Sequence, residues 1–166
     1  MSDVMRDEAV QATIAGEMFV YSNLVSALAA GATQYTAIRI GGAPLLVERR
    51  NYGTTASSIT VNFYENAPAN AGGTPIVGTN RNRTPGGLLM PEPQSVRYGV
   101  TPSGALPSPL FTLNFSDTNK ISAAFGDPNT DKLELAANTD YLFAVTNNDA
   151  SPRDFSWSWL VRRIAR

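Results

Sequence analysis

The chain has 166 residues, of which 43% are hydrophobic and 16% are charged, and its net charge is −1. This length suits one domain with a sizeable core, and the near-neutral charge gives no overall bias toward nucleic acid or an anionic membrane. Cysteine and histidine are both absent, which excludes disulfides, thiolate nucleophiles, cysteine-bound zinc and catalysis by Ser-His-Asp or Cys-His groups.

No apolar run approaches the roughly 20 residues of a membrane-spanning helix. The N-terminus is acidic where a secretion signal needs a basic start, so we expect neither a membrane partner nor a signal peptide.

Residues Met1–Ala30 differ in composition from the rest, because they are rich in alanine and contain no proline. The spacing of Val10, Ile14 and Met18 predicts a short amphipathic helix, and Ser22 is a candidate cap for a second helical stretch. We interpret this segment as an N-terminal arm. It is either a terminus or helix that lies on the domain, or an arm that orders on a partner.

From residue 32 onward, apolar and polar residues alternate in short runs bounded by Gly, Pro and Asn, which predicts β-strands. The expected strands are Ala32–Ile40, Leu45–Asn51, Ser57–Asn66, Pro75–Arg83, Leu110–Ser116, Thr139–Thr146 and Phe155–Val161, and the shorter candidates are Val96–Val100, Lys120–Phe125 and Lys132–Leu135. About eight or nine strands at this spacing imply an all-β domain over residues 31–166, an antiparallel two-sheet β-sandwich of the jelly-roll or a related type.

Three segments carry more specific expectations. Ser57–Asn66 and Pro75–Arg83 are expected to pair as antiparallel neighbours across a long loop. Thr139–Thr146 is apolar on both faces and is expected to be a central strand. Thr84–Ser108 contains five prolines and four glycines, and an irregular segment of this length inside a domain is usually functional or mobile.

The inward-facing residues of the separate strands predict the core. They are Ile59, Val61, Phe63, Phe111, Leu113, Phe115, Tyr141, Phe143, Val145 and Trp157. Trp157 and Trp159 also suggest a sugar-stacking platform, but they share a strand face with Phe155 and Val161, which favours core packing.

No pattern of catalytic or metal-binding residues stands out. The segment Asp127–Asp131, followed by Glu134, places carboxylates at alternate positions as calcium loops do. However, Lys132 occupies the place where an EF-hand loop needs glycine, so a polar hairpin turn is favoured. No two acids can be paired at a defined separation for glycosidase chemistry, and we expect no enzyme activity, cofactor or metal.

Arginines gather in two places. Asn80–Arg83 holds two cations without an adjacent aromatic residue, which is weak evidence for nucleic-acid binding. The pattern suits a solvated strand end or a subunit contact. The C-terminal arginines are Arg153, Arg162, Arg163 and Arg166. They are either simply solvated or pair with the acidic N-terminal arm or with another protein.

Two stretches carry a family resemblance. Ser57–Arg83 contains Tyr64-Glu65 at the end of an alternating strand, then Gly73-Thr74-Pro75, then Asn80-Arg81-Asn82-Arg83. Leu133–Trp159 contains Asn138-Thr139-x-Tyr141, then Val145-Thr146-Asn147, then a final aromatic strand. In this order and spacing, the motifs resemble those of the small jelly-roll head decoration, or cement, proteins of tailed bacteriophages.

The resemblance implies a non-enzymatic virion protein, made in the bacterial cytoplasm, that binds the major capsid protein on the capsid exterior as a homotrimer. The alternative is a receptor- or glycan-binding module of a phage fibre or tail. In either case no nucleic acid is bound.

We expect attachment through the termini, because the apolar residues of the arm need a surface to cover. The expected contact residues are Val10, Ile14, Met18, Phe19, Arg81, Arg83, Arg162, Arg163 and Arg166. Removal of residues 1–30 is expected to leave a folded domain.

Overall fold

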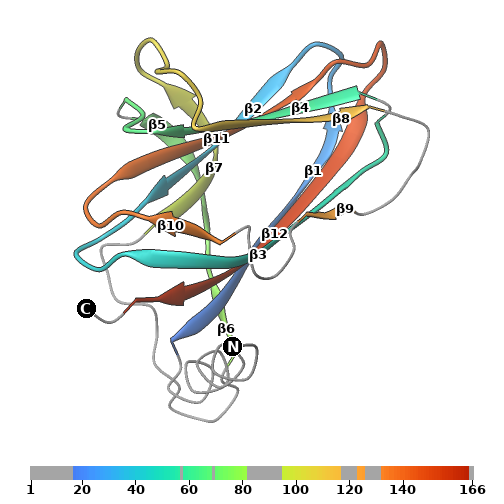
Figure 1. Cartoon of the computed structure of the whole chain (residues 1–166). Coiled ribbons are helices and arrows are strands. Elements are labelled where there is room, and N and C mark those ends of the chain that lie inside the picture. The colour runs from blue at the N-terminus through green and yellow to red at the C-terminus, as the bar shows by residue number, and fades with distance from the viewer. Residues whose placement is uncertain are drawn as a thin grey trace.

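The computed structural model describes residues 17–56, 58–68, 70–81, 95–116, 123–125 and 132–164, and within them every regular element is a strand. The strands, shown in Figure 1, are β1 (Met18–Leu28), β2 (Thr33–Arg39), β3 (Leu45–Thr54), β4 (Ser58–Glu65), β5 (Asn70–Ile76), β6 (Thr79–Asn80), β7 (Ser95–Pro102), β8 (Phe111–Ser116), β9 (Ala123–Phe125), β10 (Leu133–Leu135), β11 (Asp140–Asn147) and β12 (Arg153–Arg163).

The strands form two antiparallel sheets that pack against each other. Sheet A has the order β10-β3-β12-β1-β6, with β9 also paired to β3, and sheet B has the order β5-β7-β2-β11-β4-β8. This arrangement confirms the predicted all-β, antiparallel two-sheet sandwich. Its assignment as a jelly roll stays a prediction.

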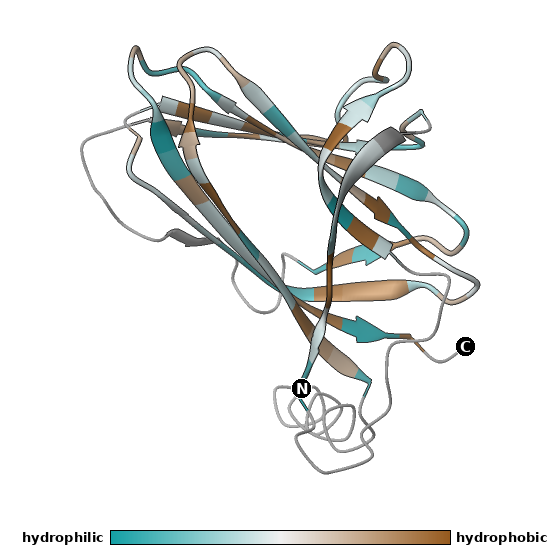
Figure 2. Cartoon of the chain, turned by 180° about the vertical axis from the view of Figure 1, so that it is seen from behind, coloured by the Kyte–Doolittle hydropathy of each residue, from teal (hydrophilic) through white to brown (hydrophobic). Residues whose placement is uncertain are grey.

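Apolar and aromatic side chains fill the space between the sheets. Seven of the ten predicted core residues are fully buried, and Phe111, Leu113 and Phe115 pack against them from the edge strand β8. At the centre, the ring of Phe143 lies 6.0 Å from that of Tyr52 and 5.5 Å from that of Trp159. Brown segments on the strands of both sheets in Figure 2 mark these apolar positions. The expected core packing of both tryptophans is therefore confirmed.

The helical interpretation of the N-terminal segment is wrong for its second half. Residues Met18–Leu28 form β1, which pairs along its length with β12. The inward positions Phe19, Tyr21 and Val25 alternate at period two and are buried, and they override the helical spacing. The domain boundary expected at residue 30 is wrong for the same reason, while residues 1–16 lie outside the described residues.

The expected pairing of Ser57–Asn66 with Pro75–Arg83 is also wrong. In sheet B, β4 lies between β11 and β8, whereas β5 lies at the far edge and pairs with β7. The chain then crosses from sheet B to sheet A, where β6 pairs with β1. The break that reads as a turn, around Gly72 and Gly73, is part of β5, with both glycines at positive φ.

β11 is the predicted central strand. It lies between β2 and β4, and residues 141–145 are buried without interruption. Its inner face joins the main core, while its outer face supports a smaller cluster of Tyr64, Val100, Leu142 and Ala144, on which Leu106 packs. Thus the described part of Thr84–Ser108 consists of β7 and a segment that covers the outer face of sheet B.

Candidate docking end

One end of sheet A gathers several of the residues that the sequence marked for attachment. We call it the docking end: the end where β1 begins and β12 finishes. Met18 of β1 lies opposite Arg162 of β12. The N–H of Arg163 donates to the carbonyl of Glu17 over 3.2 Å, and the N–H of Arg81, just after β6, donates to the carbonyl of Met18 over 2.9 Å. The backbone hydrogen bonds therefore hold Arg81 on one side of β1 and Arg162 and Arg163 on the other, at the same end of sheet A.

Arg162 belongs to a half-buried charge cluster on this end. Its Nε lies 2.8 Å from Oε1 of Glu48, whose Oε2 lies 3.0 Å from Nζ of Lys132. The carboxylate of Glu48 on β3 thus pairs with two cations, Arg162 on β12 and Lys132 just before β10. Because these side chains are held by each other, Arg162 has a structural role and is less available to a partner than its position in the sequence suggests.

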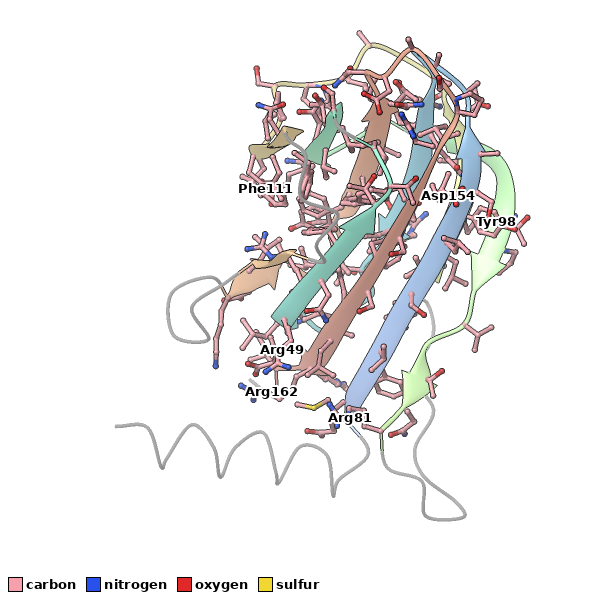
Figure 3. All side chains as sticks on the ribbon, turned by 90° about the vertical axis from the view of Figure 1, so that its right-hand side faces the viewer. Arg49, Arg81, Tyr98, Phe111, Asp154 and Arg162 are labelled. Atoms are coloured by element: carbon pink, nitrogen blue, oxygen red, sulfur yellow. The ribbon has the colours of Figure 1, made fainter. Side chains whose placement is uncertain are left out.

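Three other arginines at this end are exposed: Arg49, Arg81 and Arg163. None of them forms an ion pair with another described residue. Figure 3 shows Arg49, Arg81 and Arg162 grouped at the same end of the sheet. Each guanidinium carries five donors in a planar fork that matches a carboxylate, so this surface is suited to an acidic protein surface.

Two predicted contact residues are corrected. Met18 and Phe19 are each only 3% exposed and belong to the packed interior of this chain. A helix would leave an apolar side free for a partner, whereas the strand β1 buries both side chains. Val10, Ile14, Arg83 and Arg166 lie outside the described residues.

A second surface feature lies on the outer face of sheet A. It is a shallow open groove of about 500 Å³. Its lining comes from the middle of three adjacent strands: Ser22, Asn23, Leu24, Asn51, Tyr52, Gly53, Ser156, Trp157 and Ser158. The amide Nδ2 of Asn51 donates to Oγ of Ser158 over 3.3 Å. The sequence does not indicate this groove, because most of its residues are small and polar and because the local pattern of β1 does not predict a strand.

Gly53 lies in the lining of the groove, close to Ser156 of the neighbouring strand. A Cβ added there would lie 2.8 Å from Oγ of Ser156, inside normal contact distance. The groove offers hydroxyl and amide groups, but the rings of Tyr52 and Trp157 are buried beneath it. It therefore lacks the exposed aromatic ring on which a sugar face stacks.

In the part of the chain that the structure describes, no three acidic residues come close enough together to hold a metal ion. The same residues include no helix of the length and hydropathy needed to span a membrane. The proposed turn at Asp127–Asp131 lies outside them.

Comparison with known proteins adds no relative. No protein-family model matches the chain, and no curated protein matches it significantly.

Proposed function

We propose that this chain is a non-enzymatic structural protein of a tailed-phage virion, a decoration or cement protein that binds the assembled capsid from outside. The observation that best supports this is the docking end, where Arg81 and Arg163 are exposed at the same end of sheet A, on the two sides of β1. The motif order in Ser57–Arg83 and Leu133–Trp159 supports the same assignment.

Charge has a larger share in this attachment than the sequence suggested. With Met18 and Phe19 buried inside the domain, the described part of the docking end offers cations and not apolar side chains. Exposed ion pairs contribute only about 0–1 kcal/mol each and are screened over about 8 Å at physiological salt. Several arginines facing an acidic region of the major capsid protein would therefore act together, and binding would weaken as salt rises.

The proposal is tested by titrating the full chain onto empty capsids. Wild-type protein should saturate at a fixed stoichiometry, and the double variant Arg81→Glu, Arg163→Glu should bind at least tenfold more weakly. Arg39→Glu is the control, because Arg39 is exposed on sheet B and makes only a long 3.8 Å contact with Asp140. Equal losses for both variants, or no saturable binding by the wild type, would contradict the proposal.

The same preparation tests the proposed homotrimer, which follows from the resemblance alone. Light scattering of the free protein and a low-resolution map of decorated capsids should show three copies together. Isolated monomers in both measurements would remove the trimer from the proposal.

The alternative, a glycan-binding module of a fibre or tail, has one observation in its favour: the hydroxyl- and amide-lined groove on sheet A. If this is the function, the wild-type protein should bind a host polysaccharide and not capsids, and Asn51→Ala should abolish the polysaccharide binding. The arginine variants separate the two roles because they lie on a different part of the surface.

A further inference from the structure

β1 has one side that its neighbours leave open. It pairs with β12 from Met18 to Leu28, but with β6 only at Phe19 and Val20. Among the described strands, none pairs with β1 on that side beyond Val20. Figure 3 shows the chain of β5 and β6 diverging from β1 above the docking end. We call residues Ser22–Ser26 the free edge.

The backbone groups of the free edge point outward. The carbonyl of Glu17 bonds to β12 through Arg163, whereas the carbonyl of Met18 bonds to Arg81 on the β6 side. Because successive residues of an antiparallel strand direct their N–H and C=O groups to opposite sides, Ser22 and Leu24 direct theirs away from β12. The side chain of Leu24 is 61% exposed, one of the largest exposures of an apolar residue in the described structure.

The edges at β5 and at β3 carry protection that the free edge lacks. On the edge strand β5, Gly72 and Gly73 adopt positive φ, and Pro75 removes an N–H. The guanidinium of Arg97 also donates to the carbonyls of Gly72 and Gly73 over 3.0 and 2.9 Å. The outer side of β3 is paired with β9 and β10. Bulges, prolines and charges are the usual means by which edges avoid pairing with another chain.

The free edge contains no proline, glycine or charge, and its outward residues are symmetric. Ser22-Asn23-Leu24-Val25-Ser26 places leucine at the centre and serine at both ends of the exposed face. In an antiparallel pair of two such edges, Leu24 faces Leu24 and Ser22 faces Ser26. The bulge that follows, where Ala27 has a φ of 52° and its N–H bonds to Asp154, ends the edge.

We propose that the free edge is a self-association site that pairs antiparallel with the same edge of a second copy, about a two-fold axis at Leu24. Such an isologous contact buries the same patch on both copies. It satisfies the outward backbone groups and covers both leucines, and it joins sheet A of two molecules into one continuous sheet. Since only a few residue pairs take part, its area is well below the roughly 1,200 Å² of a stable interface, and the association is weak.

The contact does not depend on the proposed function. It joins copies two at a time, so in a trimeric protein it links one trimer to the next. On a crowded surface, where the local concentration is high, even a weak contact of this kind is populated.

Because the chain contains no cysteine, the contact can be tested with single-cysteine variants of the full chain. Leu24→Cys should form a disulfide-linked dimer under mild oxidation at least tenfold faster than Leu110→Cys. Facing residues in a hydrogen-bonded antiparallel pair lie about 5.5 Å apart between Cα atoms, within disulfide range. Leu110 is the matched control, since it is 50% exposed and lies beside sheet B. Equal rates would overturn the proposal.

A second measurement does not depend on disulfide geometry. Sedimentation equilibrium of the wild type should show a concentration-dependent monomer–dimer equilibrium, or a trimer–hexamer one if the trimer exists. Leu24→Asp should weaken it at least tenfold by placing two like charges across the axis, whereas Leu110→Asp should leave it unchanged. Association that survives Leu24→Asp, or none in the wild type at high concentration, would overturn the proposal. Capsid binding by the arginine variants is read separately, so the two proposals can fail independently.

Discussion

At the scale of single residues, Asn147 shows how a polar side chain holds two turns in a β-sandwich. It is fully buried at the end of β11. Its Nδ2 donates to the carbonyls of Leu28 and Ser151 over 2.8 and 2.9 Å, and its Oδ1 accepts from the N–H of Asp149 over 3.0 Å. The turn after β1 and the turn before β12 are therefore tied through one amide.

We predict that Asn147→Ala lowers the free energy of unfolding by about 2–3 kcal/mol, because buried carbonyls lose their donors and cannot reach water. Urea unfolding followed by tryptophan fluorescence measures this loss. Asn148→Ala is the control: its side chain makes one exposed hydrogen bond, to Thr60, and its removal should cost less than about 1 kcal/mol. If Asn147→Ala lowers the free energy of unfolding no more than Asn148→Ala does, the hydrogen bonds of the Asn147 amide do not stabilise the fold.

At the scale of elements, β1 decides where the domain begins. It supplies five buried apolar side chains to the interior: Met18, Phe19, Tyr21, Val25 and Leu28. A fully buried side chain of this kind contributes roughly 1.5–3 kcal/mol, and a whole domain is stable by only about 5–15 kcal/mol. The sandwich therefore cannot lose this strand.

This reverses the expectation from sequence for truncated proteins. Deletion of residues 1–30 should abolish the cooperative unfolding transition and the dispersed amide signals of a folded protein. Deletion of residues 1–16, which leaves every described strand in place, should preserve both. Retention of a cooperative transition without residues 1–30 would mean that β1 is dispensable. Because the variant that lacks residues 1–16 should stay folded, its capsid binding shows directly whether attachment needs those residues.

At the scale of the whole molecule, alternation within a strand could be read from the sequence, but pairing between strands could not. Ile59, Val61 and Phe63 alternate without interruption, and their strand is placed correctly. The pattern of β1 does not predict a strand because Asn23 interrupts its inward apolar series, and the pattern of β5 does not because its glycines resemble a turn. Pairing joins segments that are distant in the sequence: the hydroxyl of Tyr141 donates a hydrogen bond to Glu65, which lies 76 positions earlier in the chain. Charge indicates Arg81 and Arg163 as candidates, but their position at the same end of sheet A depends on strand registers that no local pattern encodes.

Each sheet contains a buried tyrosine, Tyr52 or Tyr141, that makes the stability of the fold depend on alkaline pH. Burial raises the pKa of Tyr52 to about 12, partly offset by the nearby charge of Arg50. Burial also raises the pKa of Tyr141 to about 12; the N–H of Ala136 opposes the shift, and hydrogen bonding to the charged Glu65 adds to it. Both phenols are thus held neutral in the interior, one in each sheet.

The sign of the effect on stability follows from linkage. An unfolded tyrosine loses its proton near pH 10, whereas these two keep theirs to about pH 12 in the folded state. Their contribution is complete below pH 10 and is lost as the pH rises to 12. For Tyr52 this amounts to roughly 3 kcal/mol. The free energy of unfolding, measured in urea from pH 8 to 12, should fall steeply above pH 10, and Tyr52→Phe should fall less steeply. Identical slopes for the two proteins would show that Tyr52 titrates in the folded state as it does in water.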